Sequence, residues 1–370
     1  MSDTLLNFRM LRLARELRGI TQTRLASDSG IPQARLSRIE SGQLPASEEE
    51  FGRLALALEL PGSFLIEPGV PAAAPLFRKR AIRSAKRLGT IQARLNTAVL
   101  IAQRLLNAGV ELDPPQTFPE PGEFPAHEPV RAAEALRRAW RLPIGRVDDL
   151  AAVIESAAGI VLYVDFGDDD ATAAFIGTTG DERMWFLLNS RERAGDRLRL
   201  SLAHELGHAV LHRMLPTAEE TDQELQAFQF ASALLLPADV FDRSIPYDAL
   251  TLARARSLKQ TYWVSIQAII RAAYDRGRIG RDRYTSLFKQ LSARGWRINE
   301  PVPIPREQPQ LWPEVLRVHR QHHGFSDQDM ADIARVDLQT LSDLFPGDFT
   351  APRLPLRVVR AVNESRGCDG

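Results

Sequence analysis

The sequence predicts a multidomain protein: an all-α helix-turn-helix bundle at the N-terminus, an α+β domain built around a histidine-bearing helix, and an α-helical C-terminal region. Three observations support this prediction. Residues 7–66 show short amphipathic helices separated by glycines, residues 160–188 contain three strand-like runs, and residues 198–213 form a proline-free helical pattern. A length of 370 residues also favours more than one domain.

Composition narrows the classes of function. Lys+Arg and Asp+Glu balance at 47 each, so any surface that binds a polyanion must be local. The single cysteine, Cys368, excludes a disulfide framework. The charged N-terminus lacks the apolar core of a signal peptide, and no apolar run is long enough to span a bilayer. We therefore expect a cytoplasmic protein without a membrane partner.

The N-terminal bundle has the spacing of a helix-turn-helix. Helices are predicted over Phe8–Leu17, Gln22–Ser29 and Pro32–Glu40, each followed within two residues by a glycine. The second helix of such a pair enters the major groove, where glutamine can read adenine and arginine can read guanine or hold phosphate. The candidate DNA-binding residues are Gln22, Gln33, Ala34, Arg35, Ser37 and Arg38.

This stretch resembles the XRE (lambda-repressor-like) helix-turn-helix domain. The matching positions are Gln22, Leu25, Ala26, Gly30, Ile31, Leu36, Ser37, Ile39, Glu40 and Gly42. The resemblance implies binding to a double-stranded DNA operator, and paired half-sites imply a homodimer. A bundle that serves only protein contact or dimerisation is the alternative.

A connecting region is predicted over 67–129. The Pro/Ala-rich residues 67–76 form one linker, and the proline-rich, acidic residues 111–129 form another. Between them a basic stretch begins at Phe77 and continues as a helix to about Asn107. This basic stretch is either an arm that contacts the DNA backbone or the solvated face of a connecting helix, and the sequence favours neither interpretation.

The run LRLSLAHELGHAVLHR, at 198–213, contains a His-Glu-x-x-His motif. Leucines recur there at helical spacing, and Asp196 is expected to cap the helix. Residues four apart lie one above the other, so His204 and His208 present both imidazoles to one point, as two ligands of a catalytic zinc. Glu205, between them, is placed to act on the zinc-bound water as general base. A chance match or a buried histidine pair is the alternative.

Glu224 is the candidate third ligand. It begins a second predicted helix, Glu224–Pro237, and shares an apolar stripe with Ala227, Ala231 and Leu234. The alternative is a solvated glutamate at a helix start. The competing residues are Glu219, Glu220 and Asp222, expected in an exposed loop, and His212, expected to support the site because three histidines in line cannot all reach one ion.

Three strand-like runs precede the histidine-bearing helix at 198–213, and further helices are expected before and after them. The runs Ile160–Phe166, Thr172–Ile176 and Met184–Leu188 predict a small antiparallel sheet, whose edge could hold an extended peptide across the zinc. Helices are predicted over Val130–Trp140 and Leu150–Ala158.

The C-terminal region contains a possible second helix pair. The pattern over Gly324–Phe345 predicts a degenerate second helix-turn-helix, whose acidic face favours protein contact or dimerisation over DNA binding.

The order of motifs from the strands onward resembles the ImmA/IrrE family of zinc metallopeptidases. The matching segments are Leu188-Asn189, Asp196-Arg197, 203–208, the later Glu-x-x-Ala…Phe-Ala…Leu-Leu-x-Pro, Leu258-Lys259, 263–266, 295–297 and Glu300-Pro301. The resemblance implies a zincin-like fold, His204, His208 and Glu224 as Zn²⁺ ligands, and Glu205 as the catalytic acid/base. The chain departs from the family at Phe228, where asparagine is usual.

The predicted organisation is a DNA-binding domain at 1–66, a basic/helical linker region at 67–129, a peptidase core at 130–240, a helical extension at 241–301 and a C-terminal helical region at 302–370. The resemblances imply a transcriptional regulator carrying a zinc metalloendopeptidase domain. They imply that it cleaves itself or an XRE-type repressor in response to a signal such as stress. The alternatives are a metal- or ligand-sensing repressor on a retired peptidase fold and an antitoxin-like repressor.

Overall fold

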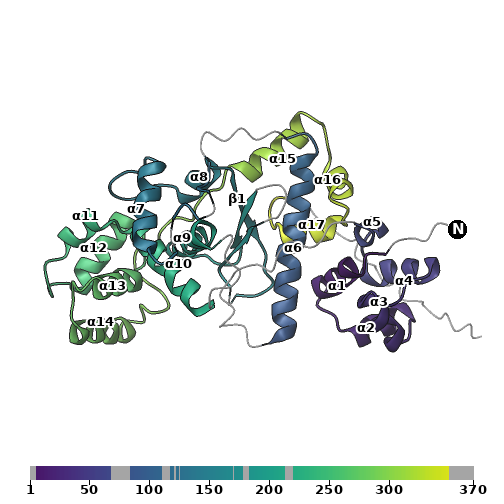
Figure 1. Cartoon of the computed structure of the whole chain (residues 1–370), viewed down its shortest axis with the longest axis horizontal. Helices are drawn as coiled ribbons and strands as arrows, with labels where there is room; N and C mark the ends of the chain where they lie inside the picture. The colour runs from purple at the N-terminus through teal and green to yellow at the C-terminus, as the bar shows by residue number, and fades with distance from the viewer. Residues whose placement is uncertain are drawn as a thin grey trace, which may run out of the picture.

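The computed structural model describes residues 6–67, 84–110, 117–120, 122–124, 126–169, 171–177, 183–212 and 220–349. A three-stranded sheet lies at the centre with helices on both faces, and the N-terminal helical bundle lies to one side (Figure 1). The multidomain fold class predicted from the sequence is confirmed: a helical bundle, a mixed α/β portion and a helical C-terminal region.

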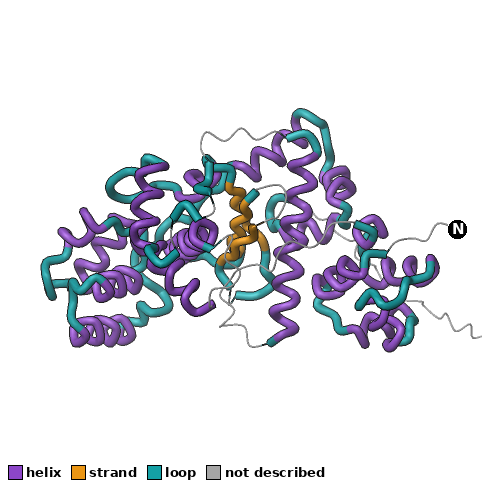
Figure 2. The backbone as a smooth tube through the Cα atoms, viewed as in Figure 1, coloured by secondary structure: helices purple, strands orange, loops and turns teal. Residues whose placement is uncertain are grey.

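The sheet consists of β1 (Gly159–Val164), β2 (Ala173–Gly177) and β3 (Met184–Asn189), in the order β1-β3-β2 (Figure 2). β2 pairs with β3 antiparallel, whereas β1 pairs with β3 in parallel. The prediction of a wholly antiparallel sheet is therefore wrong. Each strand reverses the direction of the one before it, and because β3 rather than β2 lies beside β1, the two neighbours run the same way.

Both faces of this sheet are buried, which explains its continuous apolar strands. Successive side chains along a strand point to opposite faces of the sheet. In β3, Trp185 and Leu187 belong to the apolar core shared with the N-terminal bundle, whereas Phe186 and Leu188 belong to the core around the histidine-bearing helix. The sheet therefore separates two apolar cores.

The N-terminal bundle comprises α1 (Phe8–Leu17), α2 (Gln22–Ser29), α3 (Gln33–Glu40), α4 (Glu48–Leu58) and α5 (Gly62–Leu65). Thr21 caps α2, because its side chain accepts a hydrogen bond from the backbone N–H of Arg24. Gly30 ends α2 with φ 65°, a left-handed conformation that glycine adopts without strain. The turn between α2 and α3 thus follows from its sequence.

One face of the sheet is covered by α6 (Ala85–Asn107), α15 (Leu311–Gln321), α16 (Asp327–Ala334) and α17 (Leu338–Leu344). α6 also packs against α1, so it lies between the bundle and the sheet (Figure 1). The basic residues predicted before Ser84 lie outside the described residues. The C-terminal helices α16 and α17 form the expected second helix pair, and they contribute to the same apolar core as the bundle.

The opposite face carries α7 (Pro129–Ala139), α8 (Leu150–Glu155), α9 (Gly195–Leu211) and α10 (Glu220–Leu235). Beyond them lie α11 (Ala238–Phe241), the short 3-10 helix η2 (Asp242–Ser244), α12 (Leu252–Tyr262), α13 (Ile266–Asp275) and α14 (Arg281–Ala293). No helix within the described ranges is long and apolar enough to cross a membrane.

Two carboxylates, that of buried Glu307 and that of half-buried Glu155, join α8 to the segment that leads into α15. Glu307 accepts hydrogen bonds from the backbone N–H groups of Leu150 and Ala151 at the start of α8. In return, Glu155 at the end of α8 accepts from the backbone N–H groups at the start of α15. Burial raises the pKa of each of these two carboxyls from 4.5 to about 7.

We expect Glu155 to make stability fall as the pH rises. Because the pKa of Glu155 is raised to about 7 in the folded chain, its contribution is fully present below pH 4.5 and is lost as the pH rises through 7. The free energy of unfolding of the wild type should therefore fall by about 2 kcal/mol more than that of Glu155→Gln between pH 5 and pH 8. Urea unfolding of both proteins, with chelator present, measures this difference, and parallel pH curves would contradict it.

Candidate metal centre and nucleic-acid interface

Helix α9 carries the His-Glu-x-x-His motif against the sheet, where it packs on β2 and β3. The helix begins at Gly195, with Ala194 as N-cap and no side-chain cap hydrogen bond. The prediction that Asp196 caps this helix is therefore wrong. Asp196 lies inside the first turn, and its buried carboxylate accepts a 2.6 Å hydrogen bond from Lys259 Nζ. A buried lysine needs such a partner, and local sequence does not reveal it.

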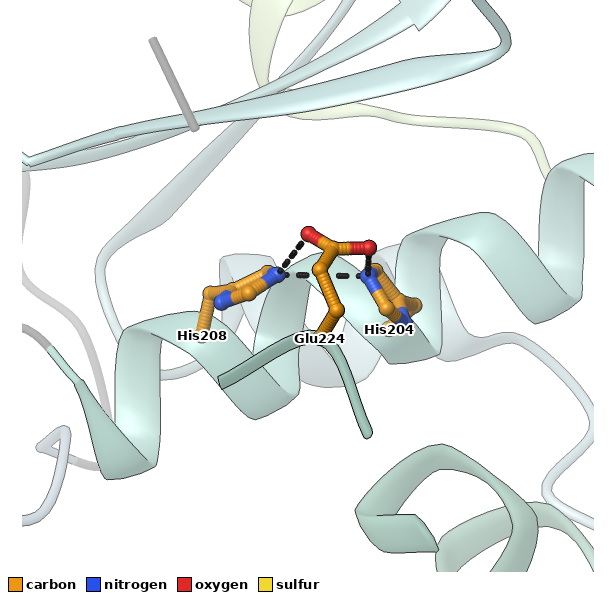
Figure 3. A group of neighbouring side chains, drawn as sticks. All are labelled: His204, His208 and Glu224. Atoms are coloured by element: carbon orange, nitrogen blue, oxygen red, sulfur yellow. Dashed lines mark hydrogen bonds and ion pairs between the residues drawn. The ribbon is translucent and has the colours of Figure 1, made fainter. Parts of the chain in front are cut away.

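Three ligand atoms converge between α9 and α10. His204 Nε2 and His208 Nε2 lie 3.2 Å apart, and the Glu224 carboxylate reaches them at 3.5 and 3.3 Å. Figure 3 shows both imidazoles on one side of α9, with the carboxylate of Glu224 across them. The structure thus brings together the three residues that the sequence singled out as ligands.

The donor set and its spacing fit a zinc ion. All three ligand atoms lie within 4.8 Å of one another, and both histidines are buried. Ligands about 2.0–2.2 Å from a tetrahedral ion lie roughly 3.3–3.5 Å apart, which matches the distances between these atoms. Burial opposes ionisation of Glu224, but its contacts with the two imidazoles outweigh it and lower the pKa of this carboxyl. The carboxylate is therefore available as an anionic ligand.

The approach of α10 depends on Gly207, inside the motif. A Cβ at this position would lie 3.0 Å from Ala227 Cα and 3.1 Å from the Ala227 carbonyl oxygen. Helix α10 begins at Glu220, four residues before Glu224, so Glu224 occupies the second turn rather than the helix start. The small residues at the crossing bring that turn over the histidines.

The competing acidic residues lie elsewhere or outside the described residues. Glu219 is not described, Glu220 begins α10, and Asp222 is exposed. His212 supports the cluster rather than joining it, since its Nδ1 lies 3.1 Å from His208 Nδ1. Burial lowers the pKa of His212 to about 4, although a hydrogen bond with Gln226 opposes this shift, so the ring is neutral near pH 7. Sequence reasoning did not identify Gln226, because a polar residue on a half-exposed helix face is common.

A cleft of about 1650 Å³ opens beside Glu224, between α7, α10 and α13. Its walls include the exposed apolar side chains of Val130 and Leu225. Phe228 also lines this cleft, and its ring packs edge-on against His204 with centroids 5.9 Å apart. An aromatic side chain thus takes the position where the resembling family usually has asparagine. Glu205, on α9, is buried.

The candidate DNA-reading residues lie on α3, except Gln22 at the start of α2. Gln33 and Ala34 at the N-terminus of α3 and Arg38 in its last turn are exposed, and Ser37 is half-buried. Gln33 Nε2 donates to Gln22 Oε1 at 3.3 Å, and Gln22 Nε2 donates to Glu40. Glu40 is buried and also paired with Arg15 of α1. The two glutamines are therefore held in place from behind by the Arg15–Glu40 pair, which sequence reasoning missed.

Arg35 has a different environment. Its guanidinium makes a two-point ion pair with Glu50 of α4, with Nη2 at 2.7 Å from Oε2. This hydrogen bond lowers the pKa of Glu50 to about 2, and Glu50 also completes a capping box with Ser47. The structure therefore ties Arg35 to the bundle itself, a contact between residues fifteen apart that periodicity does not predict.

The bundle and the His-His-Glu cluster define a DNA-binding protein with a metallopeptidase-like domain. Residues 11–65 match the family model described as Helix-turn-helix, and residues 159–274 match the model described as IrrE N-terminal-like domain. The search of curated proteins gave no match. The chain therefore joins an XRE-type helix-turn-helix domain to an IrrE-like peptidase domain, and the fusion predicted from the sequence is confirmed.

Metal uptake should depend on Glu224 and not on its exposed neighbour. We expect about one zinc ion per chain in the wild type and in Asp222→Ala, and loss of that ion in Glu224→Ala, since two imidazoles alone hold zinc weakly. Elemental mass spectrometry after dialysis against a zinc buffer measures the ratio. Equal zinc in Glu224→Ala and the wild type would remove Glu224 from the site.

Proposed function

We propose that this transcription regulator uses its IrrE-like domain as a zinc-dependent endopeptidase, which cleaves the chain itself or an XRE-type repressor in response to a signal. The observation that carries the proposal is the convergence of His204, His208 and Glu224 at ligand distances on two helices. A retired peptidase fold that senses a metal or a ligand is the competing function, and the experiment below separates the two.

The proposed roles follow the chemistry of the side chains. His204, His208 and Glu224 would hold Zn²⁺, which supplies Lewis-acid chemistry for amide hydrolysis. Glu205 is adjacent to His204 on the same helix and buried. It would accept a proton from the attacking water and deliver it to the leaving amine. The cleft beside Glu224, with its apolar walls, would hold the substrate polypeptide.

The two predicted linkers differ as sites of self-cleavage. Within 111–129, Phe118 packs against Trp140 and Phe186, and the Trp140 Nε1–H donates to the Thr117 carbonyl. Cleavage there would first require this packing to be released, because proteases need an accessible, extended backbone. Because this packing disfavours 111–129, we favour 67–76, or a partner repressor, as the substrate.

On DNA, the chain is proposed to act as a homodimer. Helix-turn-helix proteins read two half-sites about one helical turn apart, so two copies of the bundle would be needed for an operator. The exposed residues of α3, Gln33 and Ala34 at its N-terminus and Arg38 in its last turn, would contact base edges and phosphates.

The catalytic role of Glu205 can be tested apart from DNA binding. We expect Glu205→Gln to lower the rate of cleavage by about 10²–10⁴-fold, because it removes the proton acceptor, while operator affinity stays unchanged. Mass spectrometry of the zinc-loaded chain, alone and with an XRE-type repressor, follows the fragments. Glu314→Gln makes the same chemical change at an exposed glutamate of α15 and is the matched control.

Two outcomes would contradict the proposal. Fragments that form equally in Glu205→Gln and in the wild type would assign the cleavage to another agent. No cleavage by the wild type, together with an operator affinity that changes with zinc, would identify the sensing function instead.

The two arginines of α3 should have different effects. Arg38 is exposed, so Arg38→Ala should weaken binding to every DNA sequence without changing the melting temperature. It should also reduce the slope of log affinity against log salt concentration by about one, because one counterion fewer is released on binding. Arg35→Ala removes the ion pair with Glu50, so it should lower the melting temperature of the bundle. Titrations of DNA selected from a random pool, at several salt concentrations, and thermal melting distinguish the two. A purely DNA-binding effect of Arg35→Ala would contradict this assignment.

A further inference from the structure

Behind His208, two further side chains form a hydrogen-bonded series that leads away from the metal site. His208 Nδ1 lies 3.1 Å from His212 Nδ1, and His212 Nε2 lies 2.8 Å from Gln226 Oε1. His212 is buried at the C-cap of α9, and Gln226 is half-buried on α10. The series therefore connects the last turn of the metal helix to the helix that carries Glu224.

The direction of donation along this series follows from its end. An amide oxygen only accepts, so the ring nitrogen facing Gln226 Oε1 must carry the proton. A neutral His212 protonated at Nε2 has a bare Nδ1, which accepts from His208 Nδ1–H. His208 then has its lone pair on Nε2, which lies beside Glu224 and 3.2 Å from His204 Nε2, a nitrogen that can donate a hydrogen bond to it (Figure 3).

The opposite direction would leave two acceptors face to face. If His208 carried its proton on Nε2, its bare Nδ1 would need a proton from His212 Nδ1. His212 Nε2 would then be bare and would face the amide oxygen of Gln226 at 2.8 Å. Such a contact between two acceptors is unfavourable, so the position of one amide oxygen selects the tautomer two rings away.

We propose that Gln226 and His212 are positioning residues that hold His208 in the tautomer with a free Nε2, ready to bind a metal ion. This inference rests on the proposed zinc site, and it assigns to both residues a role beyond packing. Ring orientation and tautomer are set before the metal arrives, so no rearrangement of His208 opposes binding.

Substitutions at Gln226 separate hydrogen bonding from packing. Gln226→Glu keeps an acceptor and cannot donate, whereas Gln226→Met has a similar length and makes no strong hydrogen bond. His212→Phe removes the middle of the series while keeping an aromatic ring. Gln229→Met, exposed on the same helix, is the matched control.

Zinc affinity of the full chain, measured by competition with a chromophoric chelator, is the first readout. We expect a loss of about 10–100-fold in Gln226→Met and in His212→Phe, wild-type affinity in Gln229→Met, and retention in Gln226→Glu. The second readout is the ¹⁵N spectrum of the histidine rings in the metal-free full chain, which has seven histidines to assign. His208 should carry its proton on Nδ1 in the wild type and in Gln226→Glu, and lose this preference in Gln226→Met.

These readouts distinguish failure of the inference from failure of the proposed function. A wild type that binds zinc, with Gln226→Met and His212→Phe equally tight, would overturn the inference alone. A proton on His208 Nε2 in the metal-free wild type would also overturn it. A wild type that binds no zinc would remove the proposed function, while the ring spectra would still report whether the series selects the tautomer.

Discussion

The close crossing of α9 and α10 is the constraint on which the rest of the candidate metal centre depends. Two candidate ligands come from one helix and the third from the other, so the distance between the helix axes sets whether Glu224 reaches both imidazoles. Gly207 lies between the two histidines and faces the Ala227 backbone at a distance where a methyl group would force the helices apart. Packing against the sheet then fixes α9 itself, so the ligand geometry is a property of the fold rather than of a mobile loop.

The same sheet links this centre to the DNA-binding bundle. One of its faces packs on α9, and the other packs on α6, which also contacts α1 of the bundle. Ion pairs join the bundle to the C-terminal helices, Arg18 with Asp337 and Glu67 with Arg335. Partly exposed pairs of this kind contribute little beside an apolar core, so the α1–α6 packing carries the attachment. The candidate metal centre and the bundle are therefore connected through the two apolar cores on either side of the sheet.

Much of this arrangement could be predicted from sequence, because it depends on local periodicity. The bounds of α1 to α3, the paired histidines and the stripe that carries Glu224 follow from residues three and four apart. The neighbours of β1, the partner of Asp196 and the Arg35–Glu50 pair could not be predicted, because each joins residues that only the folded chain brings together. Gln226 belongs to this second group, because its hydrogen bond is with His212, fourteen residues away, and the pattern of its own helix does not predict that contact.

Buried ion pairs hold α9 near its first turns. Arg199 pairs with Glu307, and Asp196 pairs with Lys259, which also contacts Glu300. Buried pairs seldom stabilise a fold more than apolar residues of the same shape would, because desolvation offsets their attraction. These pairs do disfavour a shift of α9 along its axis, because moving the helix by one residue would leave a buried charge without its partner. The candidate metal ligands require the same precision along the helix axis, because a shift of one residue rotates both imidazoles by about 100°. The charged residues near the start of α9 therefore set the register in which His204 and His208 face Glu224.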